Sequence, residues 1–132
     1  MRYTFTADER LKREQHINTL FLTGKAFSFF PVRFMYKWLP REAGTAPARV
    51  GFSIPKKKFR SSVHRHRVRR LIFESWRLHK HLLYAHVPPH LQLHLFIMFT
   101  DNKMPNYALV EPLVVKGITK LTGTLPEVQP NA

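Results

Sequence analysis

A dense run of positive charge between residues 56 and 70 constrains this chain more than any other feature. The run holds eight cationic side chains and no acidic one, namely Lys56, Lys57, Lys58, Arg60, Arg65, Arg67, Arg69 and Arg70. Like charges repel, so placing them on one ordered element costs stability unless a polyanion relieves the repulsion. A solvated face that only aids solubility is the simpler alternative. Because arginine forks bind phosphate oxygens in pairs, the run favours a phosphate backbone as the partner.

The composition agrees with a nucleic-acid binder. The 132 residues are 44% hydrophobic, which suits one domain with a real core. The 22 Lys and Arg residues against 8 Asp and Glu residues give a formal charge of +14, for which an anionic membrane surface is the competing partner. The absence of cysteine excludes disulfides and thiolate metal sites.

No segment predicts export or membrane insertion. The N-terminal residues have no continuous apolar stretch of the kind found in signal peptides. The longest apolar run, Leu91 to Phe99, is about half as long as a membrane-spanning helix must be. We therefore expect a cytoplasmic protein.

The first half of the chain predicts a helix and two strands. Apolar spacing indicates a helix over residues 8–23, which Gly24 would end in a left-handed cap. Aromatic and β-branched residues indicate a strand over 27–39, closed by Pro40. A second strand over 49–54, ended by Pro55, is expected to form a hairpin with the first.

The second half predicts two helices and a strand. Ser61 or Ser62 can cap a helix whose core-facing stripe comprises Val68, Leu71, Ile72, Ser75, His79, Leu82 and Leu83. The opposite side would hold His66, Arg69, Arg70, Phe73 and Arg77 in solvent. A buried strand over 91–99 and a helix over 107–121 follow; the alternative for that helix is a true first turn at Pro112. The order α-β-β-α-β-α indicates one α+β layered domain over residues 1–121, followed by a flexible tail over 122–132.

The chemistry needed for catalysis by the protein itself is missing from the pattern. The eight acidic residues are scattered, so no pair suggests a carboxylate cage for magnesium. The pairs His64 with His66 and His79 with His81 would point to opposite sides of a helix, which prevents either pair from gripping one ion. We expect no metal site and no catalytic residue, and interpret the chain as a binding protein.

Residues 49–74 resemble the protein component of bacterial ribonuclease P. In that family a strand ending Gly-x-Ser-Val leads through Lys-Lys into a helix with Arg-Asn-Arg-x-Lys-Arg-x-x-Arg-Glu. This chain matches at Gly51, Ser53, Lys57, Lys58, Arg65, Arg67, Arg70 and Glu74, with Arg69 in place of a lysine. It departs from the family at Ile17, Pro55, Arg60, His66 and Phe73. Upstream, Arg10-Leu11-Lys12, Leu20, Phe21 and Gly24-Lys25 look like the family's first helix and its end.

The resemblance implies a fold and a function. The fold would be an α/β sandwich of two or three layers, like the second domain of a small-subunit ribosomal protein, with a left-handed β-α-β crossover. The partners would be the catalytic RNA of ribonuclease P and precursor tRNA, whose 5′ leader is removed. The RNA and its Mg²⁺ would do the chemistry, and a monomeric protein would join the RNA in a 1:1 complex.

The resemblance also implies two sets of site residues. The RNA-binding set comprises Lys57, Lys58, Arg60, Arg65, His66, Arg67, Arg69 and Arg70. The leader-cleft set comprises Ile17, Phe21, Met35, Tyr36 and Ser53. A plain core role remains open for Ile17 and Phe21, because apolar residues at helical spacing are usually core. A structural RNA-binding protein of the ribosomal type is the alternative function.

Overall fold

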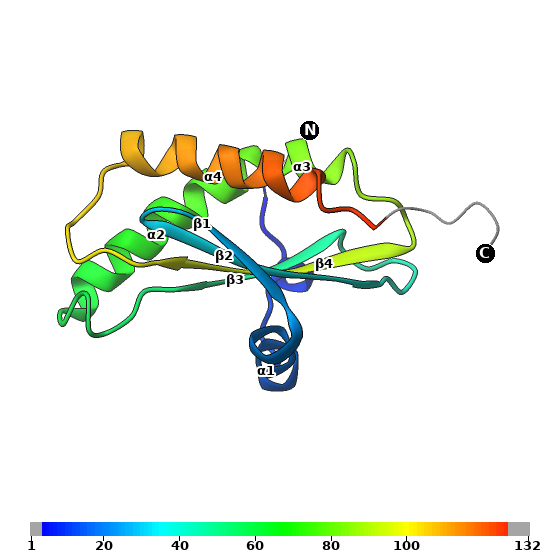
Figure 1. Cartoon of the computed structure of the whole chain (residues 1–132), viewed down its shortest axis with the longest axis horizontal. Coiled ribbons are helices and arrows are strands. Elements are labelled where there is room, and N and C mark those ends of the chain that lie inside the picture. Colours follow the sequence, from blue (N-terminus) through cyan, green and yellow to red (C-terminus); the bar gives the residue numbers. More distant parts are fainter. Residues whose placement is uncertain (1–3, 127–132) are drawn as a thin grey trace.

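The structure, a computed structural model, describes residues 4–126. In chain order its elements are η1 (Ala7–Glu9), α1 (Glu14–Thr23), β1 (Lys25–Phe29), β2 (Val32–Pro40), β3 (Ala48–Ser53), α2 (Ser62–His79), α3 (His81–Tyr84), β4 (Leu91–Phe99) and α4 (Tyr107–Thr122). Figure 1 shows three layers, with α1 on one face of a sheet and α2 and α4 on the other. The predicted α+β sandwich is therefore confirmed.

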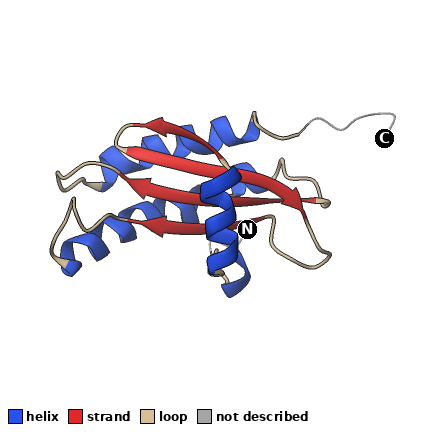
Figure 2. Ribbon diagram, turned by 60° about the horizontal axis from the view of Figure 1, so that its bottom comes forward, coloured by secondary structure: helices blue, strands red, loops and turns tan. Residues whose placement is uncertain are grey.

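The four strands form one mixed sheet in the order β1-β2-β4-β3. Strand β2 pairs antiparallel with β1 and with β4, so that Val32 lies opposite Phe99. Strand β3 pairs parallel with β4, so that Ser53 lies opposite Met98. Helix α2 returns the chain from β3 to β4 (Figure 2), which is the crossover that the resemblance implied; its left-handed sense remains a prediction.

The main core lies between the sheet and helices α2 and α4. Phe34, Ile72, Trp76 and Phe99 are fully buried there. Helix α4 approaches closely at Gly117, where an added Cβ would clash with the Phe34 ring. A second, smaller cluster of Leu11, Leu20 and Met35 lies between α1 and the other face of the sheet.

The predicted first helix begins six residues later than expected, at Glu14. The segment before it is held as an extended chain, because Arg10 forms a parallel bridge with Val50 and the Leu11 amide donates to the Val50 carbonyl at 3.1 Å. The left-handed cap is also wrong. Gly24 has a φ of −74°, which any residue can adopt.

The single strand predicted over 27–39 is two strands. The chain reverses at Phe30 and Pro31, so that residues 25–29 form β1 and pair with β2. The predicted hairpin between residues 27–39 and 49–54 is also wrong, because β4 lies between β2 and β3. Strand β4, which comes later in the chain, thus pairs with β2 where the sequence pattern predicted β3.

Helix α2 begins where the capping pattern indicates, with Ser61 accepting a hydrogen bond from the His64 amide. Strand β4 has its predicted bounds. Leu82 is exposed rather than core-facing, because α2 ends at His79 and the short α3 resets the helical phase. Pro112 lies inside α4 and not in its first turn, because the helix begins at Tyr107, five residues earlier, with Asn106 as its N-cap.

The predicted tail begins within described structure. Thr122 is the last residue of α4, and the Thr124 hydroxyl accepts from Trp38 Nε1 at 3.0 Å and donates to the Leu121 carbonyl at 2.7 Å. Residues 127–132 of the predicted tail lie outside the described residues. Within residues 4–126, no helix combines the length and the apolar character that a membrane crossing requires.

Candidate nucleic-acid interface

The loop between β3 and α2 presents the first cations of the run. After Ser53 the chain turns at Pro55, whose carbonyl accepts from the Lys58 amide at 3.0 Å. Phe59 anchors the loop because its side chain is 7% exposed and contacts the main core. Lys57, Lys58 and Arg60 consequently lie in solvent.

The first turns of α2 present the remaining members of the RNA-binding set. Val68 is fully buried, and this fixes the helix so that His66, Arg67, Arg69 and Arg70 are exposed. Arg67, Arg69 and Arg70 make no hydrogen bond or ion pair with another residue within 4–126, so their guanidinium groups remain available to a ligand.

Arg65 has a different role from its neighbours. It is half-buried, and its Nη1 donates to the Phe59 carbonyl at 2.9 Å and to the Arg60 carbonyl at 3.0 Å. These bonds fasten the basic loop to the start of α2. Arg65 therefore shapes the surface as well as adding charge to it.

A groove runs between α2, β3 and the N-terminal segment, and we call it the β3–α2 groove. It has a volume of about 460 Å³, and its lining includes Arg10, Lys12, His66, Arg69 and Arg70. A neighbouring hollow of about 340 Å³ shares Phe52, His66 and Arg69 with it and extends to Ser53 and Arg65. Cations thus stand on both walls of the groove.

Arg10 and Lys12 were not assigned to the RNA-binding set from the sequence. The sequence Arg10-Leu11-Lys12 could have indicated them, because the buried Leu11 side chain turns both of its cationic neighbours outward. Glu74 is the acidic residue in the groove lining, and it pairs with Arg77 at 2.7 Å. The ion pair leaves the groove with a large excess of positive charge.

Three aromatic rings lie at the floor of the groove. The Phe73 ring stands edge-on to Phe5 at 5.1 Å between centroids and to Phe52 at 5.7 Å. Arg10 lies 5.8 Å from the Phe5 centroid. The prediction that Phe73 lies in solvent is wrong, because the N-terminal segment folds over this side of α2 and half-buries the ring.

The predicted leader-cleft residues divide between the two faces of the sheet. Ile17 and Met35 contact the small cluster beneath α1, and Ser53 lies on the same face of β3. Tyr36 alternates with Met35 on β2 and packs instead against the main core, beside Phe27. The prediction that Tyr36 lines the cleft with Met35 is therefore wrong, because the two side chains lie on opposite faces of the sheet.

Phe21 is the most accessible residue of that set. Its side chain is 48% exposed, and its ring meets the Phe96 ring edge-on at 5.4 Å. Phe96 and Met98, which sequence reasoning did not assign, pack beside Ile17 on this face. We call Ile17, Phe21, Phe96 and Met98 the apolar patch.

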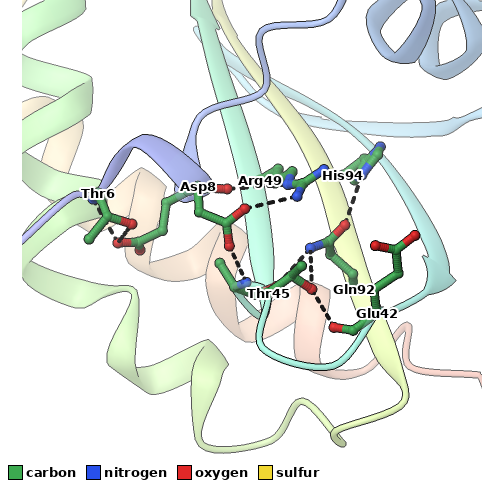
Figure 3. Close-up of polar contacts among 9 residues, drawn as sticks. Thr6, Asp8, Glu42, Thr45, Arg49, Gln92 and His94 are labelled. Carbon is green, nitrogen blue, oxygen red and sulfur yellow. Dashed lines mark hydrogen bonds and ion pairs between the residues drawn. The ribbon is translucent and has the colours of Figure 1, made fainter.

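Polar residues occupy the other end of the same sheet face (Figure 3). Arg49 Nη2 donates to Asp8 Oδ1 at 2.8 Å, and its Nε donates to the Asp8 carbonyl at 3.2 Å. The hydrogen bonds from Arg49 and from the Ala46 amide hold the pKa of Asp8 below its ordinary value. The pair fastens η1 to the start of β3.

A buried ion pair fastens η1 to the other end of α2. Lys80 Nζ bonds Glu9 Oε2, and both side chains are 7% exposed. Burial acts to raise the pKa of Glu9, but hydrogen bonds from Lys80, the Thr6 amide and the Tyr84 hydroxyl lower it further than burial raises it. The Lys80–Glu9 pair thus holds the N-terminal segment, which forms one wall of the groove, against the end of α2.

The part of the chain described here offers no ready metal centre. Residues 4–126 contain no group of three or more His, Cys, Asp or Glu side chains placed to hold an ion. His79 instead bonds Glu111 at 3.1 Å, which lowers the pKa of that carboxyl.

Comparison with known proteins supplies the decisive observation. The model of the family described as ribonuclease P matches residues 5–121. The chain belongs to the ribonuclease P protein family. The ribonuclease P protein component of Porphyromonas gingivalis is 36% identical over 126 residues, which cover 94% of this chain and 90% of that protein.

Solved structures of ribonuclease P proteins share the fold. The Staphylococcus aureus protein has a TM-score of 0.64 and 17% identity, over 86% of this chain and 94% of its own. The Thermotoga maritima protein has a TM-score of 0.63 and 15% identity, over 85% of this chain and 96% of its own. Membership makes this chain a protein subunit of ribonuclease P, the ribonucleoprotein endoribonuclease that processes the 5′ end of precursor tRNA.

Proposed function

We propose that the β3–α2 groove and the basic loop bind the catalytic RNA of ribonuclease P, and that the apolar patch binds the unpaired 5′ leader of precursor tRNA. The observation that carries this proposal is the set of exposed cations on two sides of one groove, from Arg10 and Lys12 to Arg69 and Arg70. Each cation that neutralises a phosphate releases a condensed counterion, which favours binding.

The apolar patch suits a strand of varied sequence. Unpaired bases stack on aromatic faces, and each stacked base contributes about 1–3 kcal/mol irrespective of its identity. Phe21 offers an exposed ring, and Phe96 supports it from the sheet. Ser53 lies between this patch and the basic loop, which would allow one RNA chain to contact both surfaces.

The division of labour follows from the residues present. The described residues provide positive charge and stacking surface but no carboxylate cluster, so Mg²⁺ would be held by the RNA. Neutralising the phosphates of leader and catalytic RNA lowers their mutual repulsion. We further propose a 1:1 complex of one protein with one RNA, acting in the cytoplasm where tRNA precursors are processed.

The leader contact can be tested with neighbouring residues of α1. Phe21→Ala should weaken holoenzyme binding to precursor tRNA by roughly 5- to 150-fold, which corresponds to one stacked base. It should leave binding of leaderless tRNA unchanged. Leu22→Ala is the matched control, since Leu22 is 84% exposed and adjacent in sequence. An equal effect of the two variants, or an equal loss with and without the leader, would exclude the proposed leader contact.

A further inference from the structure

A second pocket lies on the α1 face of the sheet, at the end opposite the basic loop. Its volume is about 600 Å³, which is within the usual range for ligand sites. Its lining comprises Arg13, His16, Leu39, Pro40, Arg41, Glu42, Thr45, Arg49, Gln92 and His94. We call it the His94 pocket. Because β3 and β4 are parallel, their first residues lie here and their last residues lie near the start of α2.

Two buried polar side chains from β4 form part of its wall. Gln92 and His94 are each 5% exposed. Gln92 Nε2 donates to the Ala46 carbonyl at 2.8 Å, which fixes the amide so that its Oε1 faces His94 Nε2 at 3.2 Å (Figure 3). Nε2 of His94 must then carry the proton, and Nδ1 is left as an acceptor.

That acceptor is without a partner among residues 4–126. Burial, together with electrostatic interactions with His16, Arg49 and Lys37, lowers the pKa of His94 to about 4, so the ring is neutral at pH 7. A polar side chain buried at this position costs free energy that an apolar residue would not. The pocket therefore keeps one hydrogen-bond acceptor, on a largely buried side chain, available to a ligand.

The rim of the pocket is positively charged. Arg13 is exposed and has no ion pair within the described residues, and it precedes α1 as an N-cap without a side-chain capping bond. Arg41 is held by hydrogen bonds to the carbonyls of Pro89 and Pro88 at 2.9 and 3.0 Å, which leave its charge uncompensated. Glu42 is the acidic residue in the lining, and Asp8 compensates Arg49.

An imidazole pair provides an aromatic surface beside these charges. The His16 ring lies 5.0 Å from the His94 ring between centroids, with 46° between their planes. His16 is on α1 next to Ile17, which packs at the apolar patch. Helix α1 therefore separates two binding surfaces, the apolar patch and the His94 pocket, and contributes residues to both.

We propose that the His94 pocket binds one unpaired nucleotide of the 5′ leader, further from the cleavage site than the nucleotides on the apolar patch. Arg13 and the uncapped start of α1 would hold the phosphate, His16 would stack on the base, and His94 Nδ1 would accept from an exocyclic amino group. This inference rests on the proposed leader contact, because a leader that crosses α1 reaches both surfaces.

The experiment uses reconstituted holoenzyme and precursor tRNAs with three leaders. One leader retains a single nucleotide, one reaches only the apolar patch, and one is long enough to cross α1. The double variant Arg13→Ala/His16→Ala should weaken binding of the longest leader alone by roughly 20-fold or more, which combines about 4-fold for one phosphate contact at about 0.15 M salt with about 5-fold or more for one stacked base. Lys120→Ala, on α4 behind the opposite face of the sheet, removes the same charge as a control.

An equal loss with all three leaders, or no loss with any, would overturn the proposal. Phe21→Ala in the same assay separates the two hypotheses. If Phe21→Ala weakens leader-dependent binding and the double variant does not, the proposed role of the His94 pocket is refuted and the leader contact at the apolar patch is retained. NMR of the wild-type protein provides a second readout. A leader oligoribonucleotide should shift the His94 ring signals, whereas the same shifts with inorganic phosphate alone would overturn the contact with the base.

Discussion

Replacing Arg69 and Arg70 together by alanine removes two charges from the wall of the β3–α2 groove without removing a contact within the described structure. Both side chains are exposed, and alanine favours the helix that carries them. Arg65 would be a poorer choice, since its Nη1 also binds two carbonyls of the basic loop. The double variant should therefore unfold at the same denaturant concentration as the wild type.

The magnitude follows from counterion release. Each phosphate contact contributes about 0.7–0.9 to the slope of log affinity against log salt concentration, so two contacts contribute about 1.4–1.8. At about 0.15 M salt, this loss corresponds to roughly 15- to 30-fold weaker binding of the catalytic RNA. Binding would be measured by filter retention or fluorescence anisotropy over a series of salt concentrations.

The control is Lys116→Ala/Lys120→Ala, which removes the same charge from α4. The two lysines lie over the Phe29 and Phe27 rings of β1, the edge strand at the opposite side of the sheet from β3 and the groove. The control should leave the salt slope nearly unchanged. If both double variants reduce the slope equally, RNA affinity depends on net charge and not on the groove. An unchanged slope in Arg69→Ala/Arg70→Ala would refute phosphate contacts at these residues.

Three further changes test other parts of the structure. Lys80→Met leaves the buried Glu9 carboxylate without its cation, so urea unfolding should show a loss of about 3–5 kcal/mol, and a loss under about 1 kcal/mol would contradict the buried pair. Phe73→Arg removes the ring contacts of the groove floor and should cost about 1–3 kcal/mol in the same measurement, whereas unchanged stability would contradict those contacts. The pKa of His94 is lowered from 6.5 to about 4 in the folded protein, so the unfolded chain binds the proton more strongly. Stability should therefore fall as the pH drops from 6.5 to about 4, by at most about 1.4 kcal/mol per pH unit, and His94→Gln should remove this dependence. An NMR titration that gives His94 an ordinary pKa would contradict its burial.

Sequence patterns predicted the start of α2 and the bounds of β4, because residues next to these boundaries determine them. The pair Pro88-Pro89 and the apolar run after it defined β4, and Ser61 defined the start of α2. The arginine positions on α2 followed from the buried stripe that contains Val68 and Ile72. The family motif then gave the function, because its residues specify a particular RNA-binding surface.

Long-range contacts account for what the sequence did not predict. The position of β4 between β2 and β3 depends on pairs that are far apart in the sequence, such as Val32 with Phe99 and Ala48 with Leu93, and no local pattern encodes them. Arg10 and Leu11 are extended because they bridge to Val50, although their spacing suits a helix. The half-burial of Phe73 and the interior position of His94 likewise depend on segments that pack on them from elsewhere in the chain.

The most direct test of the central claim is reconstitution with the organism's own ribonuclease P RNA. Purified protein would be added to that RNA at a magnesium concentration too low for efficient cleavage by RNA alone, and the release of the 5′ leader from a precursor tRNA would be followed. We expect the protein to stimulate cleavage at the mature 5′ end, and Arg69→Ala/Arg70→Ala to reduce this stimulation. A folded protein that binds the RNA and leaves cleavage unchanged would contradict its role as the ribonuclease P subunit.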